Sequence, residues 1–380
     1  MIETEVIIVG SGLTGLIAAR YFEKTNIKYV LIDKNNIASV IKNDLRTTAI
    51  NYTVCQNFQY LGIWDELSEN AGPIKNIIIR DQKSSEVLFK EGMVKFSPMG
   101  YILPNSKIKS ALLKKISDKN LLSKTEVLNI SSDNNFIYAE TNQKTKIKAK
   151  LVIAADGKFS NLKSNFNIED FEHNYKQTSY IFNVTHSKNH NNFALEQFLN
   201  DGPLAFLPLH ENDKSSVVFT KSKNANNSKD FIEKELNEIA ADYYGDIKIN
   251  SEIKSFPIFL KFTNKYYLNR IVFVGDALHS IHPVAGQGFN LTVSDIEKLI
   301  HLILKFKKNG MDFGSKIMLA KFKKDRLVTN NSMVATTHFL VKLFSNSNNF
   351  VNLARNSGLK IFDRSKMLKK SAIAHAMGLK

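Results

Sequence analysis

The chain of 380 residues is longer than one hydrophobic core usually organises, so we expect two closely packed domains. Its apolar fraction of 43% and charged fraction of 23% are those of an ordinary soluble globular protein. The single cysteine, Cys55, excludes an intrachain disulfide and is expected to be a small buried residue rather than a nucleophile. Because no apolar run reaches 18 residues and the N-terminal segment is not that of a signal peptide, we expect a cytoplasmic protein.

The net charge of +16 is concentrated near the C-terminus. Residues 301–380 hold 16 Lys and Arg against three acidic residues. This asymmetry indicates a basic surface facing an anionic partner, although a general lysine-rich composition would leave the same charges solvated without one. Segments 333–344 and 365–378 can be drawn as short helices with one apolar side, which suit an anionic membrane or packing against the main body. No recognised nucleic-acid module accompanies the charge, so we expect no nucleic-acid partner.

The N-terminal segment predicts a complete βαβ unit. EVIIVG is a buried parallel strand, LIAARYFEKT a helix, and YVLID a second strand that ends at Asp33. The turn after the first strand reads Gly10, Ser11, Gly12, Leu13, Thr14, Gly15. In this position the glycines permit a tight turn, close approach of a pyrophosphate and close helix packing. Asp33, with Lys34 beside it, suits a ribose hydroxyl and disfavours a 2′-phosphate, so the nucleotide is FAD or NAD; the alternative is a glycine turn that binds no phosphate.

Two further stretches repeat the pattern of a strand, a small turn and a helix. They are LVIAADGKFSNLK and IVFVGDALHSIHPVAGQGFNL, the second with a helix expected near Phe289. Residues 76–104 and 178–220 are instead rich in short alternating β segments. The fold class is therefore α/β, a Rossmann-like nucleotide-binding domain with an inserted β-sheet substrate domain and a C-terminal helical segment. We expect nucleotide-binding parts at 1–75, 105–175 and 263–330, substrate-domain parts at 76–104 and 176–262, and a basic helical tail at 331–380.

The three motifs, in this order and at these separations, resemble those of the class A flavoprotein aromatic hydroxylases related to para-hydroxybenzoate hydroxylase. DLRTTAINYTVCQNFQYLGIW, FLNDGPLAFLPL, GDALHSIHPVAGQGFNL and the final AMGL are similar to the ubiquinone-biosynthesis hydroxylases. The resemblance implies that FAD is bound by the glycine turn and by a further set: Asp33, Lys34, Arg46, Asn105, Val127, Asp156, Gly157, Gly275, Asp276, Pro283, Gly286, Gln287, Gly288, Phe289 and Asn290.

The same resemblance implies a role for each part of this set. Asp276 would hold ribityl and ribose hydroxyls, and Pro283 would pack beside the isoalloxazine ring. Residues 286–288 would offer backbone N–H groups to the pyrimidine edge, where the following helix would stabilise the anionic reduced flavin. Arg46 and the Asp156 motif would serve the phosphates, the latter also pyridine-nucleotide use. Asn105 would lie beside FAD, and the backbone of Val127 would contact adenine.

Histidines are the remaining chemical candidates. His279 and His282 are spaced H-x-x-H, but no third ligand accompanies them, so we expect no metal and a structural role for His279. His210 borders the expected substrate sheet and is a weak candidate for assisting phenol deprotonation. An exposed turn histidine is the alternative, and the catalytic residues are otherwise unassigned.

The implied reaction is ring hydroxylation of a polyprenylated phenol in ubiquinone biosynthesis. NADH or NADPH would reduce FAD transiently, and O₂ would react through a flavin C4a-hydroperoxide. The basic tail would meet the inner face of the cytoplasmic membrane or other ubiquinone-biosynthesis proteins. Alternatives are hydroxylation of a soluble aromatic compound, an O₂-independent prenyl reductase, and a non-catalytic flavin-binding scaffold.

Overall fold

The computed structural model describes residues 1–38, 44–82, 85–222, 227–346 and 348–379. A mostly parallel sheet forms the nucleotide-binding half, in the order β20–β21–β13–β2–β3–β9. Its strands are β2 (Val6–Val9), β3 (Tyr29–Ile32), β9 (Leu121–Leu122), β13 (Leu151–Ala154), β20 (Tyr267–Leu268) and β21 (Ile271–Phe273). The central strands are nearly continuous runs of buried aliphatic residues, as expected where both faces of a parallel sheet are covered.

Helices and two smaller sheets surround this parallel sheet. The helices are α1 (Leu13–Thr25), α3 (Tyr52–Leu61), α4 (Trp64–Ser68), α5 (Asn105–Leu113), α6 (Asn161–Asn165) and α8 (Gln287–Lys308), with the 3-10 turn η1 (Asp118–Asn120). One small sheet contains β1 (Ile2–Glu3), β12 (Lys146–Ala149), β11 (Ile137–Thr141) and β10 (Val127–Ser132). The other contains β4 (Thr47–Asn51), β8 (Gly100–Pro104) and β5 (Gly72–Ile74). Cys55 is buried in α3, as predicted.

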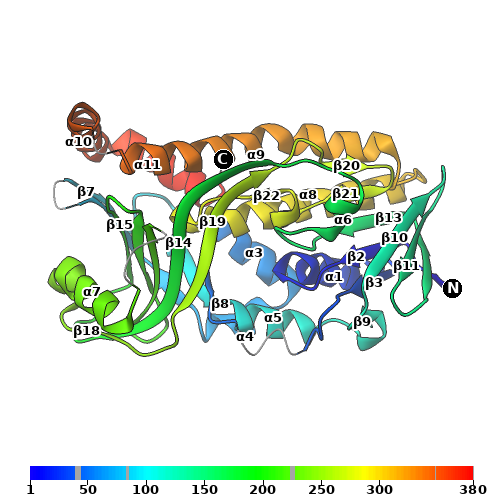
Figure 1. The fold of residues 1–380 in the computed structure, drawn as a ribbon, viewed down its shortest axis with the longest axis horizontal. Helices are drawn as coiled ribbons and strands as arrows, with labels where there is room; N and C mark the ends of the chain where they lie inside the picture. The colour runs from blue at the N-terminus through cyan, green and yellow to red at the C-terminus, as the bar shows by residue number, and fades with distance from the viewer. Residues whose placement is uncertain (39–43, 83–84, 223–226, 347, 380) are drawn as a thin grey trace.

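A large, mostly antiparallel sheet forms the other half, in the order β22–β19–β14–β17–β16–β15–β6–β7. Its strands are β6 (Asn76–Asp81), β7 (Ser85–Phe89), β14 (Phe171–His186), β15 (Phe193–Phe198), β16 (Pro203–Pro208), β17 (Lys214–Ser222), β19 (Lys254–Phe262) and β22 (His279–Ser280), with β18 (Ile247–Ile249) beside β14. Helix α7 (Lys229–Tyr244) covers it with Ile232, Leu236, Ala240 and Tyr244, a buried stripe at four-residue spacing. The long strands β14 and β19 run between the two halves (Figure 1).

Three helices follow α8: α9 (Lys316–Phe344), α10 (Asn349–Arg364) and α11 (Lys366–Ala376). α9 runs along one side of the molecule, and α10 and α11 reach the end where β7 lies (Figure 1). The predicted short helix at 333–344 is instead the last part of α9, because residues 316–344 contain no Gly or Pro to end the helix earlier. The helix expected near Phe289 begins two residues earlier, after Gly286 with φ +60°.

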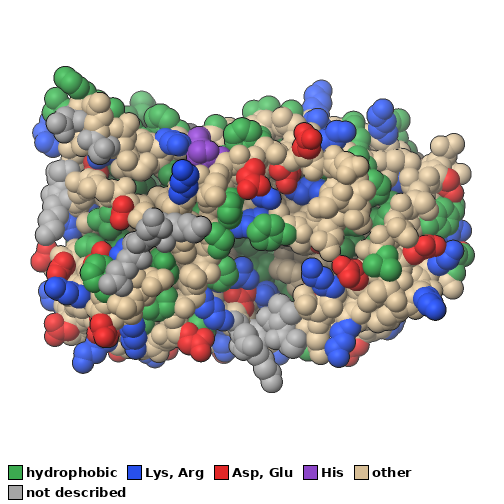
Figure 2. Space-filling view, viewed as in Figure 1, with side chains coloured by type: hydrophobic (Ala, Val, Ile, Leu, Met, Phe, Trp, Pro, Cys, Tyr) green, Lys and Arg blue, Asp and Glu red, His purple; other side chains and the backbone are tan. Residues whose placement is uncertain are grey.

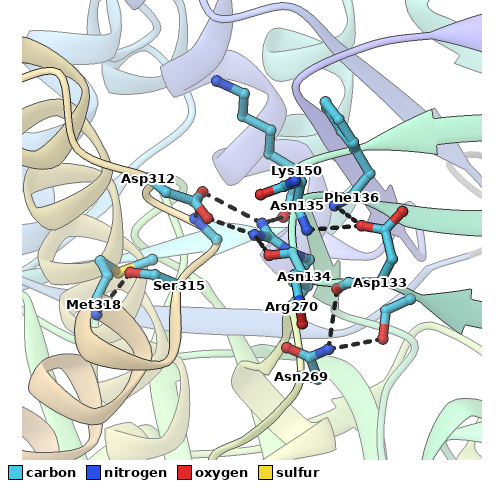
Figure 3. Close-up of polar contacts among 12 residues, drawn as sticks. Asp133, Asn134, Asn135, Phe136, Lys150, Asn269, Arg270, Asp312, Ser315 and Met318 are labelled. Carbon is cyan, nitrogen blue, oxygen red and sulfur yellow. Dashed lines mark hydrogen bonds and ion pairs between the residues drawn. The ribbon is translucent and has the colours of Figure 1, made fainter.

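Arg270 links the parallel sheet, the small sheet that contains β10, β11 and β12, and the turn between α8 and α9 (Figure 3). Its side chain is only 2% exposed. The guanidinium donates to the carbonyl oxygens of Lys150 and Asn134 and pairs with Asp312, which lies between α8 and α9. These acceptors satisfy both terminal nitrogens of the buried guanidinium, so this residue fixes how the α8–α9 turn sits on the sheets.

Candidate functional site

Three loops predicted to bind nucleotide meet at the ends of adjacent parallel strands. β2, β13 and β21 are neighbours, and their following residues are the glycine turn, Asp156 and Gly275. A Cβ on Gly10 would lie 2.4 Å from the carbonyl oxygen of Ala155, and a Cβ on Gly275 would lie 2.6 Å from Thr14 Oγ1. These approaches require glycine at both positions, so the three loops form one continuous surface.

Two glycines of these loops border open space instead. A Cβ on Gly12 or Gly157 would have no heavy atom of the described residues within 4 Å, whereas one on Gly15 would lie 1.8 Å from the Gly10 carbonyl oxygen. Gly15 is therefore needed for packing α1 on its strand, while the bare backbone at Gly12 and Gly157 leaves room for a ligand. This is the arrangement that a pyrophosphate at the start of α1 requires, so the residues fit a bound dinucleotide.

Asp33 lies beside this turn and holds it. Its Oδ2 accepts hydrogen bonds of 2.7 Å from both the backbone N–H and the hydroxyl of Ser11. The backbone of Thr125 donates to the Asp33 carbonyl oxygen, which brings the segment ending at the buried Val127 alongside, while Lys34 is exposed. Asp33 thus has a structural partner that the sequence did not indicate, in addition to its predicted ribose role.

The loop after β21 is braced on both sides. It comprises the 3-10 turns η2 (Gly275–Ala277) and η3 (Val284–Gly286) with β22 between them. β22 pairs with the end of β19, so the loop is also an edge strand of the large sheet. Asn290 donates to the carbonyl oxygens of Ala49 and Gly286 and accepts from the backbone of Asn51. We call residues 275–290 the flavin loop, after the role that the sequence predicts for them.

The N-terminus of α8 and the carboxylate of Asp276 set the electrostatic potential at the flavin loop. α8 begins at Gln287 with no acidic residue in its first turn, so the positive end of its dipole is not neutralised there. Asp276 is reached by solvent although protein surrounds it on most sides. That surrounding raises the pKa of Asp276, and the positive charges of His279, Arg46 and Lys158 oppose the rise. Burial lowers the pKa of Lys158, and the negative charge of Asp276 opposes this shift.

Arg46 and Asn105 are neighbours in the fold, because the Asn105 backbone N–H donates to the Arg46 carbonyl oxygen. Arg46 pairs with Asp44 at 2.7 Å, and Lys109 pairs with the same carboxylate at 2.8 Å. Burial acts to raise the pKa of Asp44, but the hydrogen bonds and charges of Arg46 and Lys109 hold it well below its usual value. Asn105 accepts from the Thr48 hydroxyl at the start of α5. Asp44 and Lys109 were not identified from the sequence, because their spacing gives no local signal.

A buried ionic network behind the flavin loop was also missed. Asp295 on α8 is fully buried and accepts from His279 Nε2 at 2.6 Å, from Arg326 Nε at 2.5 Å and from Asn330 Nδ2 at 3.2 Å. Burial acts to raise the pKa of Asp295, but His279 and Arg326 together hold it below its usual value. An acid within an apolar helical stripe was the available signal, because such a charge must have a partner.

The remaining candidate histidines, His282 and His210, lie in different environments. His282 is fully buried, with Nε2 3.4 Å from Gln177 Oε1, and burial lowers its pKa to about 4. His279 and His282 therefore have different partners. Within the described residues, no group of three or more His, Cys, Asp or Glu side chains is placed to hold a metal ion. His210 is exposed in the bend after β16.

No helix in the described part of the chain is long and apolar enough to cross a membrane. The fold resembles that of solved monooxygenase and FAD-bound structures. The chain superposes on p-nitrophenol 4-monooxygenase PnpA from Pseudomonas putida DLL-E4 with a TM-score of 0.80 and 16% identity, covering 99% of both chains. HpxO from Klebsiella pneumoniae, solved with FAD and uric acid, gives a TM-score of 0.78 at 13% identity, covering 98% of this chain and 96% of that one. The predicted fold class is confirmed.

Sequence comparison gives the family. A family model described as FAD binding domain matches residues 3–336. The chain is 30% identical to ubiquinone hydroxylase UbiL of Rhodospirillum rubrum, covering 98% of this chain and 89% of the relative. It is 26% identical to 3-demethoxyubiquinol 3-hydroxylase of Escherichia coli, covering 99% of both. The chain therefore belongs to this family of FAD-binding flavoproteins, in which relatives that match nearly its whole length are named as ubiquinone hydroxylases.

Proposed function

We propose that this protein is an FAD-dependent monooxygenase that hydroxylates the aromatic ring of a polyprenylated phenol in ubiquinone biosynthesis. NADH or NADPH and O₂ are its co-substrates. The names of its full-length relatives support the substrate class. The observation that carries the proposal is the pairing of β22 with β19, which fixes the flavin loop to the large sheet and so joins the nucleotide site to the substrate domain.

The residues that would hold FAD follow from the three loops. The open backbone at Gly12 and the start of α1 suit the pyrophosphate, and Asp156 lies beside Gly10 in the same surface. We also assign Arg46 to the phosphates. Asp156 Oδ1 is a buried acceptor with no partner among the described residues, which fits a donor supplied by a ligand. We assign Asp276 to the ribityl hydroxyls and the backbone of residues 286–288 to the pyrimidine edge.

When bound, FAD would accept hydride from NAD(P)H, and the reduced flavin would activate O₂. The chain's own contribution is electrostatic and geometric. The start of α8 favours negative charge beside residues 286–288, and the large sheet positions the ring and excludes water. No side chain is required to bond covalently to the substrate.

We propose the inner face of the cytoplasmic membrane as the place of action, with other ubiquinone-biosynthesis proteins as alternative partners of the same tail. Apolar side chains on α10 and α11 are exposed: Phe350, Leu353, Ile361, Met367 and Leu368. Apolar side chains gather where α10 lies, with Lys and Arg nearby (Figure 2). Apolar residues flanked by cations suit the surface of an anionic bilayer.

Sedimentation with anionic vesicles tests the membrane proposal. Replacing Phe350 and Leu353 together by Asp should reduce the bound fraction severalfold, and added salt should reduce wild-type binding. Val328→Asp is the matched control, because Val328 is equally exposed on α9 but lies outside residues 331–380. Equal sedimentation of all three proteins would contradict the proposal.

Quinone profiling tests the reaction itself. The protein is expressed in bacterial strains that each lack the hydroxylase for one ring position, and quinones are measured by mass spectrometry. Restored ubiquinone in one strain, lost with Asp276→Ala, would establish the pathway and the ring position. No restoration by a soluble, FAD-loaded protein would exclude this substrate class.

A further inference from the structure

An open apolar groove lies between the loop at residues 92–96 and helix α11. Its volume is about 1010 Å³. It is lined by the loop residues 92–96, by residues of α11 between 366 and 374, and by Leu379. We call this feature the α11 groove. Its size is at the upper end for small-molecule sites.

The lining of the α11 groove is amphipathic in a particular way. Its walls carry Met93, Val94 and Phe96 on one side and Met367, Leu368 and Leu379 on the other, while the lysines belong to the same segments. Met367 is 76% exposed and Leu368 is 42% exposed. Apolar side chains left open to water in a contiguous patch mark a binding surface, because exposure sacrifices the free energy of their burial.

The floor of the α11 groove is shared with the core that supports the flavin loop. Under the groove, Ile373 and Met377 pack in a cluster with Val87 and Phe89, and Ile77 and Ile79 lie against it. Ile79 also packs in the cluster that contains Val284 of the flavin loop. Apolar packing therefore continues beneath the surface from the groove to the flavin loop through Ile79, so the two features lie against one core.

Ring stacking and hydrogen bonds give the same proximity. The ring of Phe96 stacks on Tyr52 with centroids 4.3 Å apart. Next to Tyr52, the Asn51 side chain donates to the carbonyl oxygen of Ala376 in α11, and the Asn51 backbone donates to Asn290. One residue thus contacts both the inner end of α11 and the flavin loop.

We propose that the α11 groove holds the polyprenyl chain of the substrate while its ring lies at the flavin loop. This inference rests on the proposed function, because only a substrate with a long hydrocarbon chain needs such a site. The groove offers apolar contact along its length, and none of its described lining residues is a buried polar group that would fix a particular headgroup, which suits an uncharged flexible chain. Its lysines suit the anionic bilayer from which the chain arrives, since cations near a membrane face are attracted to anionic lipids.

The test compares two phenols with the same ring, one with a long polyprenyl chain in neutral micelles and one with a single prenyl unit. Ala374→Trp fills the groove, and His375→Trp places the same ring on the next residue, which is exposed and outside the groove. Ala374→Trp should lower the ratio of kcat/KM for the long chain over the short chain about tenfold, through KM, a change of about 1.4 kcal/mol. His375→Trp should keep the wild-type ratio.

A second variant guards against misfolding and gives a readout other than turnover. Met367→Asp changes an exposed side chain, so the fold should persist, and Val328→Asp is its control outside the groove. Binding of each phenol to the oxidised, FAD-loaded protein is followed by the perturbation of the flavin absorbance. Met367→Asp should weaken binding of the long-chain phenol severalfold and leave the short-chain affinity near that of wild type.

The outcomes separate the groove from the proposed function. Turnover of neither phenol by the wild type would contradict the proposed function itself. Turnover of both, with chain-length ratios unchanged in Ala374→Trp and Met367→Asp, would overturn the groove assignment alone. If those variants instead lost only sedimentation with anionic vesicles, the groove would serve a bilayer lipid and the assignment would be wrong.

Discussion

The imidazole of His279 in the flavin loop lies 2.6 Å from the carboxylate of Asp295 on α8. Arg326 on α9 holds the other oxygen of that carboxylate, so the loop is anchored to two helices through one buried charge. Removing one member of a buried ion pair leaves the partner uncompensated, which usually costs about 3–5 kcal/mol.

We expect Asp295→Asn to lower the free energy of unfolding by about 3 kcal/mol, because Arg326 would keep its buried charge without an anion. It should also weaken FAD binding, since the single amide oxygen of Asn cannot accept from both His279 and Arg326, and the His279 ring is then held less firmly. Denaturant unfolding of the FAD-loaded protein and a fluorescence titration of apoprotein with FAD measure the two effects. Asp325→Asn is the control, because Asp325 pairs with Lys298 across the same two helices at a more exposed position and should change stability by less than about 1 kcal/mol. Equal stability of both variants would refute the anchoring role.

In the glycine turn, we expect one substitution by alanine to prevent folding and another to weaken FAD binding. Gly15→Ala should prevent correct folding, because its Cβ would overlap the Gly10 carbonyl oxygen. Gly12→Ala should fold, because its Cβ meets only open space, yet bind FAD about tenfold more weakly or worse, since it occupies the room for the pyrophosphate. Circular dichroism and the ratio of flavin to protein absorbance distinguish the two. A fully flavinated Gly12→Ala protein would show that the pyrophosphate lies elsewhere.

His282 makes the stability depend on pH. Burial lowers its pKa from 6.5 to about 4, so the folded protein binds this proton less readily than the unfolded chain. The contribution of neutral His282 to the free energy of unfolding is therefore complete above pH 6.5. About 3 kcal/mol of this free energy is lost as the pH falls towards 4. Unfolding free energies measured from pH 7 to pH 4 should fall less steeply for His282→Gln than for wild type. Parallel curves would contradict this prediction.

Arg355 docks α10 on the large sheet. Its Nε lies 2.6 Å from Asp81 Oδ2 at the end of β6, and both side chains are buried. We expect Asp81→Ala to loosen residues 349–376, so that their backbone amides exchange at least about tenfold faster in hydrogen-exchange mass spectrometry. Asp363→Ala, which removes the more exposed partner of Lys369, should change exchange much less. Unchanged exchange in Asp81→Ala would mean that apolar packing alone holds the helix.

The sequence was sufficient for the parts of the site that are local. The βαβ unit follows from an apolar strand, the Gly10–Gly15 turn and Asp33, all within about one supersecondary unit, and the structure has these elements. The fold class and the FAD-binding family were also predicted correctly. The domain ranges and the individual FAD contacts stay predictions.

The parts that were missed depend on contacts between distant residues. Asp295 and Arg326 meet only because α8 and α9 pack together, and no spacing rule links residues 31 apart in the chain. The full length of α9 was also missed, although residues 316–344 contain no Gly or Pro, because much of this stretch is polar. The α11 groove likewise forms between residues 92–96 and 366–379, which contact each other only in the folded chain.

The hydrogen bond from Asn51 to Ala376 has a consequence for the synthesis of the protein. The two residues are 325 positions apart, and Thr53 makes similar bonds to Met377 and Gly378. Domains fold largely from the N-terminus as the ribosome extends the chain, so the βαβ unit can form early while β4 still lacks this support. The brace behind the flavin loop is completed only after residue 376 has been made and has found its place. Deleting the residues after Ile373 would therefore remove hydrogen bonds that support the end of β4, a strand translated more than three hundred residues earlier.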